Sequence, residues 1–239
     1  YSVDARWLVP HFEKMLYDSA LLVVAYLEAY QATGEKEFER IVRETLGFLQ
    51  RDMASPAGGF FSATDADSPT PDGRREEGYF FTWTPKELEE VLGKDRARIV
   101  ARKFGVTEPG NFEGRSILHL QESPSIGGAN PALSGEGRDD ISPEVKEILY
   151  QSRSRRPPPL RDEKILTAWN GLAVSAFAKA GLVLGDPSLV DQARKTARFL
   201  LGNMLRNGKL FRSYMDGTAR HDALLQDYSF LAAGLLDLY

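Results

Sequence analysis

Two long apolar segments predict helices that are buried on most faces. In residues 11–30 the apolar positions fall on every side of a helix with 3.6 residues per turn, which is typical of a core helix. Residues 165–184 show the same pattern, and a third apolar segment begins near Leu224. The apolar positions of the first segment are Phe12, Met15, Leu16, Leu21, Leu22, Val23, Val24, Tyr26, Leu27 and Tyr30.

An amphipathic segment follows each of the first two apolar segments. Its apolar residues recur at helical spacing, and charged residues occupy the opposite side. Gly34 separates the first pair of segments and Gly185-Asp186-Pro187 the second, as expected where one helix stops and another starts. The two apolar stripes are Phe38, Ile41, Val42, Thr45, Leu46, Leu49 and Met53, then Leu189, Val190, Ala193, Ala197, Leu200, Leu201 and Met204.

The two helical pairs are copies of one repeat. A shift of 151 positions aligns the pairs without a gap, and a short β-like stretch ends each copy, at residues 59–62 and 210–213. A buried helix paired with an outer amphipathic helix, repeated, predicts an α/α solenoid or a closed toroid. Aligned identities include Gly34 with Gly185, Arg43 with Arg194, Phe48 with Phe199, Met53 with Met204 and Asp65 with Asp216.

The residues between the copies are less regular. Thr84-Pro85-Lys86-Glu87 has the pattern of a capping box and predicts a helix running to about Phe104. Residues 124–140 are rich in Gly, Ser and Pro, which predicts a loop, and Ser142-Pro143-Glu144 starts another helix. No independent linker is visible, so we predict one domain over residues 1–239.

Composition narrows the possible functions. A formal net charge of −4 gives no reason to expect a nucleic-acid or membrane partner. There is no cysteine, which excludes disulfides and thiol chemistry and suits the cytoplasm. No apolar run approaches the roughly 20 residues needed to cross a bilayer. We interpret the basic run Arg153–Arg156, followed by three prolines, as a solvated helix end and a stiff connector.

The two ends of the sequence indicate a piece of a longer chain. Residue 1 is Tyr, and the last helical segment, from Asp227 to Tyr239, carries no stop signal. We therefore expect residues outside this sequence to contribute to its function.

Five segments together resemble a known family. The most specific is residues 6–18, Arg-Trp-Leu-Val-Pro-His-Phe-Glu-Lys-Met-Leu-Tyr-Asp, and the others are residues 58–68, 77–84, 162–171 and 226–231. Over its whole length the chain resembles the thioredoxin-domain-containing proteins related to spermatogenesis-associated protein 20.

This resemblance implies both a fold and a neighbouring domain. The fold is all-α, a partial (α/α)6 toroid of the six-hairpin glycosidase type with short β-hairpin stretches, similar to N-acylglucosamine 2-epimerase. The neighbour is a thioredoxin-like domain upstream in the intact chain. The sequence predicts fewer helices than a closed ring of this type requires, so we expect the ring to be open.

The starts of the buried helices are the candidate site, because helix N-termini favour anions and would line the mouth of such a ring. We predict His11 as a general base, or else as a locally packed histidine. Lys14 is a predicted substrate ligand, although an i, i+4 pair with Asp18 also explains it. Asp227, in the third buried helix, completes the predicted acid–base group, with helix capping as the alternative.

Asp65 and Asp67 form a second cluster of candidates. Alternate positions of an extended segment point to one side, so the two carboxylates can divide acid and base roles, with Asp67 catalytic and Asp65 binding substrate. An Asx-turn leading into Ser68-Pro69 is the structural alternative. The segment lacks a complete calcium-ligand pattern, and we expect no metal and no cofactor.

Further candidates would hold the ligand rather than react. Arg6, Trp7, Trp169 and Asn170 are predicted to bind substrate, and Asp162 is a possible N-cap of the second buried helix. Flat aromatic side chains stack on sugar rings, although aromatics at such spacings more often pack in a core. Both alternatives, stacking on a sugar ring and packing in the core, apply to Trp7, Trp83, Trp169 and Tyr79.

Two functions of different classes follow. In the first, the toroid binds a carbohydrate or similar polyol and performs acid–base hydrolysis or epimerisation through His11, Asp67 and Asp227. In the second, it is a non-catalytic binding scaffold beside the thioredoxin-like domain, because each polar candidate also has a structural explanation.

Overall fold

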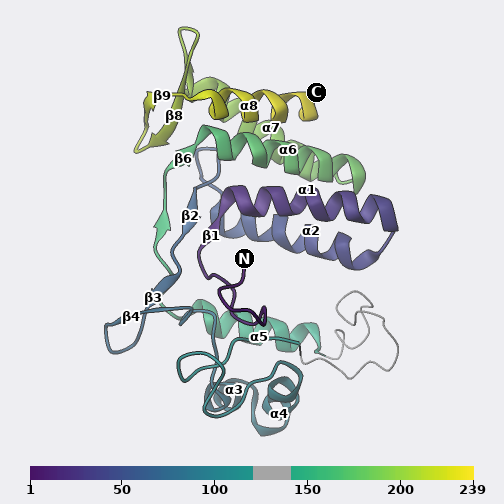
Figure 1. Ribbon diagram of the computed structural model, residues 1–239, viewed down its shortest axis with the longest axis vertical. Helices are drawn as coiled ribbons and strands as arrows, with labels where there is room; N and C mark the ends of the chain where they lie inside the picture. Colours follow the sequence, from purple (N-terminus) through teal and green to yellow (C-terminus); the bar gives the residue numbers. More distant parts are fainter. Residues whose placement is uncertain (121–140) are drawn as a thin grey trace. The chain divides into compact units, whose positions relative to one another are not determined.

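The computed structural model describes residues 1–120 and 141–239 (Figure 1). By its internal contacts the chain divides into two compact units, each described by itself. Unit 1 consists of Tyr1–Glu13 and Asp65–Leu160, and unit 2 of Lys14–Thr64 and Arg161–Tyr239. The loop predicted over residues 124–140 lies outside the described residues, and the single domain stays a prediction.

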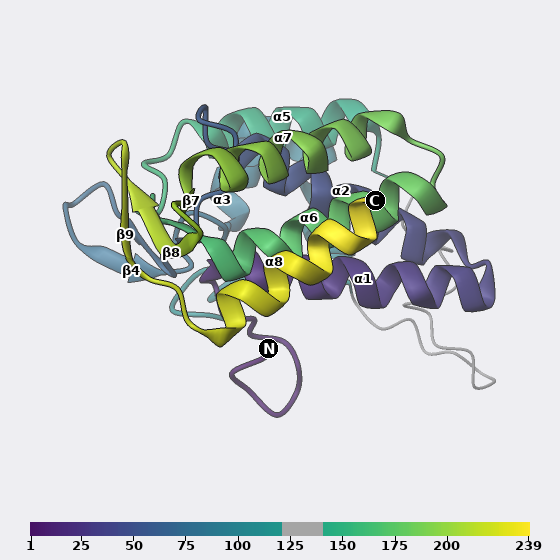
Figure 2. The same ribbon diagram turned by 90° about the horizontal axis from the view of Figure 1, so that it is seen from above.

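Unit 2 contains the predicted helical pairs. Helices α1 (Leu16–Thr33), α6 (Thr167–Val183) and α8 (Leu225–Leu238) lie side by side with α6 in the middle, and all three start at the same end (Figures 1 and 2). α2 (Lys36–Phe48) packs against α1, and α7 (Pro187–Asn203) against α6. The two hairpins and the third helix are confirmed, with Leu224 immediately before α8.

The repeat is visible in the backbone as well. Gly34 and Gly185 both follow the first helix of their copy in the left-handed region, at φ 73° and 64°. Lys14 pairs with Thr64 in the first copy, and Ile165 pairs with Tyr214 in the second, so the pairings differ by one residue. A shared hydrophobic core joins the two copies, including Leu16, Leu46, Phe60, Phe177, Leu200 and Met204.

Short antiparallel strands lie where α1, α6 and α8 start (Figure 1). One sheet has the order β1-β2-β5, and the other has the order β6-β8-β7 with β9 on β8. The predicted stretch 210–213 lies inside β8, whereas 59–62 precedes β2 and follows the π-helical turn η1 (Leu49–Met53). The strand bounds are β1 Lys14–Met15, β2 Ala63–Thr64, β5 Arg161–Asp162, β6 Ile165–Leu166, β7 Leu205–Arg206, β8 Lys209–Met215 and β9 Thr218–Asp222.

The first buried helix begins later than the sequence predicted. His11 was expected at its start, but α1 begins at Leu16, because Lys14 and Met15 pair with β2. The Leu16 N–H continues that pairing by donating to the Ser62 carbonyl at 2.9 Å. Phe12 belongs to unit 1, where its ring lies 5.5 Å from that of Phe112. His11 is therefore held by a loop rather than by a helix.

The described residues of unit 1 form a β-hairpin and three helices. β3 (Asp67–Pro69) pairs with β4 (Arg75–Glu77), and α3 (Pro85–Leu92), α4 (Lys94–Lys103) and α5 (Pro143–Ser154) enclose a second core. The helix predicted over residues 84–104 is thus interrupted, at Gly93 with φ 76°. Both predicted helix starts are confirmed: the Thr84–Glu87 capping box forms, and the Ser142 hydroxyl accepts from the Val145 N–H.

Helix α6 is the most deeply buried element of unit 2. Eleven of its 17 residues are buried, compared with four of 18 in α1 and three of 14 in α8. A Cβ atom on Gly171 would lie 2.6 Å from the backbone nitrogen of Leu231, so α6 and α8 touch backbone to backbone. Only glycine permits that approach, because any side chain would force the two helices apart.

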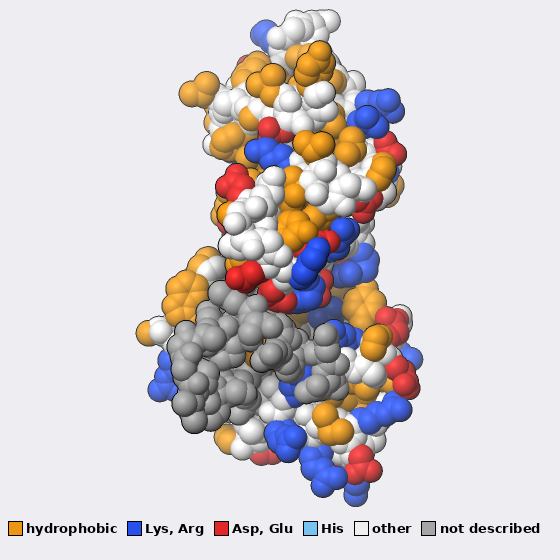
Figure 3. Space-filling view, turned by 90° about the vertical axis from the view of Figure 1, so that its right-hand side faces the viewer, with side chains coloured by type: hydrophobic (Ala, Val, Ile, Leu, Met, Phe, Trp, Pro, Cys, Tyr) orange, Lys and Arg blue, Asp and Glu red, His pale blue; other side chains and the backbone are white. Residues whose placement is uncertain are grey.

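Helix α8 is apolar on faces that the described residues leave uncovered. Leu225 and Leu236 are 84% and 77% exposed, and Leu182 at the end of α6 is 82% exposed. Figure 3 looks at the ends of these helices and shows exposed apolar side chains beside charged ones. No described helix is long and apolar enough to cross a membrane.

The contact between α6 and α8 predicts the effect of adding one methyl group. Gly171→Ala should lower the free energy of unfolding by about 2–3 kcal/mol, because the methyl group overpacks a backbone contact. In α7, Gly202 has open space around it, so Gly202→Ala should be neutral or stabilise by about 0.5–1 kcal/mol. Chemical denaturation of both variants measures the difference, and similar stabilities would contradict the close contact.

Candidate functional site

The first eleven residues form a hairpin whose base carries His11. The Val3 N–H donates to the Val9 carbonyl at 2.9 Å, and the His11 N–H donates to the Tyr1 carbonyl at 3.0 Å. The rings of Tyr1 and His11 stack with centroids 4.8 Å apart. His11 is thereby fixed from one side by backbone pairing and by an aromatic face.

The Asp4 carboxylate organises the tip of this hairpin. It accepts hydrogen bonds from the N–H groups of Leu8 at 3.0 Å and Val9 at 2.7 Å, and from the Ser2 hydroxyl at 2.8 Å. The bonds from Val9 and then Ser2 lower the pKa of the Asp4 carboxyl. The interactions favour the ionised carboxylate and are lost as the pH falls through that lowered pKa.

Trp7 is presented by this tip. Its backbone has φ 58°, in the left-handed region that bulky residues rarely adopt, and the residue is 82% exposed. Arg6 beside it is also exposed, and its N–H donates to Asp4 at 3.0 Å. The tip therefore offers a flat aromatic face and a cation to solvent, in a backbone conformation that the Asp4 bonds hold.

His11 lies between two carboxylates. Its Nε2 is 3.2 Å from Glu13 Oε2, which is a hydrogen-bonding distance, and its Nδ1 is 3.6 Å from Glu77 Oε1. The side chain is 21% exposed. Glu13 can therefore orient the ring, while Nδ1 and Glu77 are separated by slightly more than a hydrogen bond and can exchange a proton with a bound molecule.

Asp67 is the strand partner of Glu77 in the β3–β4 hairpin. In that hairpin Asp67 pairs directly with Glu77, so the two side chains leave the same face of the sheet. Directly opposite residues have Cβ atoms about 4.5–5.5 Å apart, and like charges at such positions repel. The sequence candidates His11 and Asp67 are thus linked through Glu77.

Asp65 is occupied by other contacts. Its Oδ2 accepts from the Arg75 guanidinium at 2.8 Å, and its Oδ1 accepts from the Asp67 N–H at 3.2 Å. The second bond is the Asx-turn that the sequence offered as the structural alternative. A substrate would have to compete with Arg75 for the Asp65 carboxylate.

Close packing of Gly78 against Phe12 fixes Glu77 relative to His11. Gly78 has φ 69°, and a Cβ atom there would lie 2.6 Å from the Phe12 ring. The Gly78 N–H also donates to the Ala66 carbonyl at 3.0 Å, next to Asp67. Because Phe12 follows His11 and Gly78 follows Glu77, this contact sets the spacing of the imidazole and the carboxylate.

The segment after Gly78 is held by Arg156. Its Nη1 donates to the carbonyls of Tyr79, Phe80 and Thr82 at 3.2, 3.0 and 2.6 Å. The Arg156 side chain is only 12% exposed. The interpretation of the basic run Arg153–Arg156 as solvated is wrong for Arg156, because carbonyls far away in the sequence bind it.

In unit 2, Asp227 has the geometry of a helix cap. It is 1% exposed; its Oδ1 accepts from the Ala168 N–H at 3.1 Å and its Oδ2 from the Leu224 N–H at 2.8 Å. It thus binds the first turn of α6 and the residue before α8. Both carboxylate oxygens are engaged, which favours the capping alternative over the predicted catalytic role.

Asn170 has a similar structural arrangement. It is fully buried; its Nδ2 donates to the carbonyls of Phe60 at 3.0 Å and Leu166 at 2.9 Å, and its Oδ1 accepts from the Phe60 N–H at 2.7 Å. The side chain thereby ties the loop before β2 to the start of α6. The N-cap of α6 is Leu166, so the proposed capping role of Asp162 is wrong.

The remaining candidates are aromatic or basic. Trp169 packs on Tyr17 with ring centroids 4.7 Å apart, and Lys14 lies in β1. Trp83 is 3% exposed, and Arg156 lies 4.2 Å from the centroid of its ring. Trp83 therefore packs in the core of unit 1 and does not offer a face to a sugar.

The predicted site residues thus divide between the two units. Unit 1 holds His11, Asp67, Asp65, Arg6 and Trp7, and unit 2 holds Lys14, Trp169, Asn170 and Asp227. Within unit 1 the structure brings Glu13 and Glu77 to His11, and it pairs Asp67 with Glu77 across the β3–β4 hairpin. Among the described residues, no group of three or more acidic or histidine side chains has the arrangement of a metal site.

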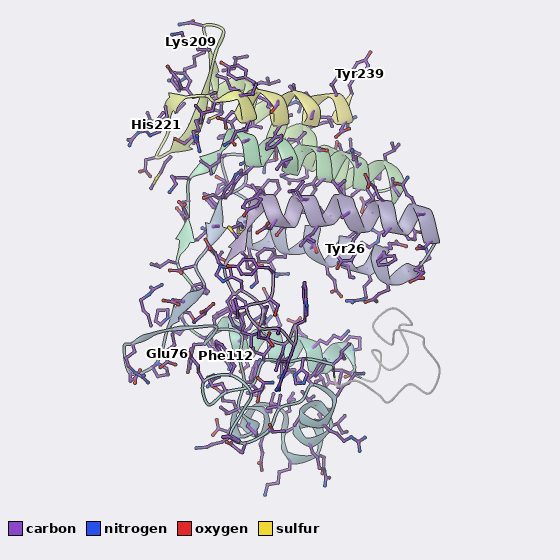
Figure 4. All side chains as sticks on the ribbon, in the orientation of Figure 1. Tyr26, Glu76, Phe112, Lys209, His221 and Tyr239 are labelled. Carbon is purple, nitrogen blue, oxygen red and sulfur yellow. The ribbon has the colours of Figure 1, made fainter. Side chains whose placement is uncertain are left out.

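Glu77 was not predicted as a site residue, and Glu13 was not included in the predicted acid–base group. A signal for Glu77 was present: Pro71-Asp72-Gly73 is a strong turn sequence, and it predicts that the flanking strands pair. The Gly73 N–H donates to the Thr70 carbonyl at 3.0 Å in that turn. Figure 4 labels Glu76, which precedes Glu77 in the sequence of β4, and Phe112 in the same unit.

Comparisons with known proteins find close relatives in sequence. No family model matches the chain. The chain is 36% identical to spermatogenesis-associated protein 20 of Homo sapiens, and 36% identical to that of Rattus norvegicus, over 269 aligned positions that include all of this chain. It spans 34% of the length of each relative, so activities of the whole proteins do not transfer directly.

Solved structures give a weaker likeness. Cellobiose 2-epimerase from Spirochaeta thermophila aligns with a TM-score of 0.29 and 15% identity, covering 95% of this chain and 71% of that one. A D-mannose isomerase aligns with a TM-score of 0.28 and 11% identity, covering 87% of this chain and 46% of that one. These scores are too low to carry a function to this chain.

The packing of Gly78 predicts a loss of stability in unit 1. Gly78→Ala should lower the free energy of unfolding by about 2–4 kcal/mol, since the methyl group meets Phe12 and the left-handed backbone is strained. Gly73→Ala has the same kind of strain at φ 84° but open space, so about 1–2 kcal/mol is expected. Equal losses in denaturation experiments would show that Phe12 does not press on Gly78.

The capping geometry of Asp227 predicts a stability effect in unit 2. Asp227→Asn should destabilise by about 1–3 kcal/mol, because the amide replaces one of two acceptors for buried N–H groups. Asp222→Asn, at an exposed position near the start of α8, should change stability little. Thermal unfolding of the two variants tests this, and an unchanged Asp227→Asn protein would exclude the capping role.

Proposed function

The chain belongs to the family of spermatogenesis-associated protein 20, and from that premise we propose that it performs acid–base chemistry on a carbohydrate or similar polyol in unit 1. The observation that carries the proposal is His11 between Glu13 and Glu77, at 3.2 and 3.6 Å, with Asp67 paired opposite Glu77. One imidazole and three carboxylates, on the His11 segment and on the β3–β4 hairpin, supply both a proton acceptor and a proton donor.

The four groups have different roles in this proposal. Glu13 holds the His11 ring by its hydrogen bond to Nε2, and Nδ1 exchanges the proton with substrate. Glu77 and Asp67 lie opposite each other in the β3–β4 hairpin, and we assign the second proton transfer of the reaction to one of them. Hydrolysis of a glycoside and epimerisation of a reducing sugar both need such a pair of proton transfers.

The exposed tip of the His11 hairpin supports the substrate class. Trp7 is 82% exposed on the hairpin whose base holds His11, and an aromatic face of this kind can pack on the apolar face of a sugar ring. Arg6 beside it can donate to sugar hydroxyls. The left-handed backbone of Trp7 is a strained feature of the sort found at binding sites.

For unit 2 we infer that the helical layers form part of an (α/α)6 toroid. Support comes from α1, α6 and α8 side by side with a common start, and from α2 and α7 behind the first two. The uncovered apolar residues of α8, such as Leu225 and Leu236, provide a surface for further helices. A thioredoxin-like domain in the whole protein, and a place in the cytoplasm, complete the proposal.

A second candidate function is a binding scaffold without turnover. The specific observation in its favour is that the side chains of Asp227 and Asn170 already form hydrogen bonds with backbone groups. In that case neither of these two side chains is available to react at the start of α6 or α8. Turnover that Asp67→Asn abolishes would contradict the scaffold function.

Substitutions at the His11 cluster test the acid–base function. The whole protein is screened against glycosides and reducing sugars, and His11→Gln and Glu77→Gln should each lower kcat/KM by about 10²–10⁴-fold on the substrate found. Glu76→Gln is the matched control, because Glu76 pairs with Arg74 at 2.8 Å and is the neighbour of Glu77 on the same strand. Its kcat/KM should stay within about twofold.

Three outcomes decide between the functions. Folded His11→Gln and Glu77→Gln proteins that retain full turnover would contradict the assignment of these residues. Equal losses in all three variants would indicate a general effect of charge. No turnover on any sugar or glycoside, together with binding of one of them, would favour the scaffold function.

A further inference from the structure

Unit 1 contains a cavity that does not involve the His11 cluster. Its volume is about 320 Å³, at the lower end of the range for small-molecule pockets. It lies between α3 and the end of α5. Its polar and aromatic lining comprises Tyr79, Trp83, Glu87, Glu90, Arg155 and Arg156.

Arg156 forms the inner wall of this cavity. Its guanidinium stacks over Trp83 at 4.2 Å, and its Nη1 is saturated by three carbonyl oxygens. Its Nη2 is 3.5 Å from Glu87, and no acceptor for its Nε lies among the described residues. The guanidinium therefore retains N–H donors for a ligand while its position is already fixed.

Positive charge exceeds negative charge at the inner wall. Arg115 binds Glu87 at 2.6 Å, so Arg115 and Arg156 share one carboxylate. The two arginine side chains are 14% and 12% exposed, which makes an uncompensated charge unfavourable. Burial is the main cause that lowers the pKa of Arg156; the charge of Glu87 opposes that shift and the charge of Arg115 adds to it.

The rim of the cavity carries one cation and one anion. Arg155 is exposed, and its side chain has no partner among the described residues. Glu90 is 63% exposed, and its ion pair with Lys86 is long, at 3.8 Å. Pro71, Val91 and Pro157 supply apolar surface between the charged groups.

We propose that this cavity binds a small ring-bearing anion, a carboxylate or a phosphate, with its charged group on Arg155 and Arg156. A carboxylate or a phosphate head can accept hydrogen bonds from both guanidinium groups, and the ring packs on the apolar surface between them. The inference goes beyond the proposed function, because none of these residues belongs to the His11 cluster.

Calorimetric titration of the whole protein tests the site with three probes: phenyl phosphate, benzoate and inorganic phosphate. Phenyl phosphate or benzoate should bind in the millimolar range or tighter, and inorganic phosphate more weakly, because it lacks the ring. Arg155→Gln should weaken binding of the ring-bearing probe about tenfold, the loss of one charge-assisted hydrogen bond. Glu90→Gln should strengthen it severalfold by removing a repelling charge.

Arg98→Gln is the matched control, since Arg98 is an exposed arginine on α4 that pairs with Asp95 at 3.0 Å. Its affinity for the probe should equal that of the unaltered protein. The proposal is overturned if no probe binds at millimolar concentration, if Arg155→Gln and Arg98→Gln have the same effect, or if Glu90→Gln weakens binding. Preference for phenyl phosphate or for benzoate identifies the anionic group.

Discussion

The burial of α6 on two sides is the constraint on which the rest of unit 2 depends. A helix leaves its first N–H groups without partners inside the helix, and in a buried helix water cannot satisfy them. Asp227 satisfies the Ala168 N–H, and Asn170 links the Leu166 carbonyl to the backbone of Phe60. Because Gly171 lets α8 approach so closely, Asp227 can reach α6 from the neighbouring helix.

This constraint explains why the candidate chemistry lies in unit 1. Side chains that form hydrogen bonds with the backbone at the start of a buried helix are not free to bind or react. Asp227 and Asn170 are side chains of that kind. His11, by contrast, lies on a partly exposed hairpin beside two carboxylates. The pairing of β3 with β4 adds Asp67, and the contact of Gly78 with Phe12 fixes the spacing. Packing holds this cluster without using up its polar groups.

Local patterns predicted much of this fold. The repeat, the buried helices and the Thr84 capping box depend on residues close in sequence, and the structure confirms them. The start of α1 was wrong because Lys14 and Met15 pair with residues about fifty positions away, which helical periodicity does not reveal. Arg156 was misjudged for the same reason, since its partners are distant carbonyls. Glu77 could have been predicted as a site residue if the turn at Pro71-Asp72-Gly73 had been recognised as the turn of a β-hairpin.

Hydrogen exchange at the start of α6 tests the central claim most directly. Ala168 and Gln226 are both second residues of a helix, but only Ala168 has an acceptor among the described residues, the Asp227 carboxylate. The Ala168 amide should therefore exchange at least about tenfold more slowly than that of Gln226, after correction for intrinsic rates. Equal rates for the two amides would contradict the account, because Asp227 would then be free for another role.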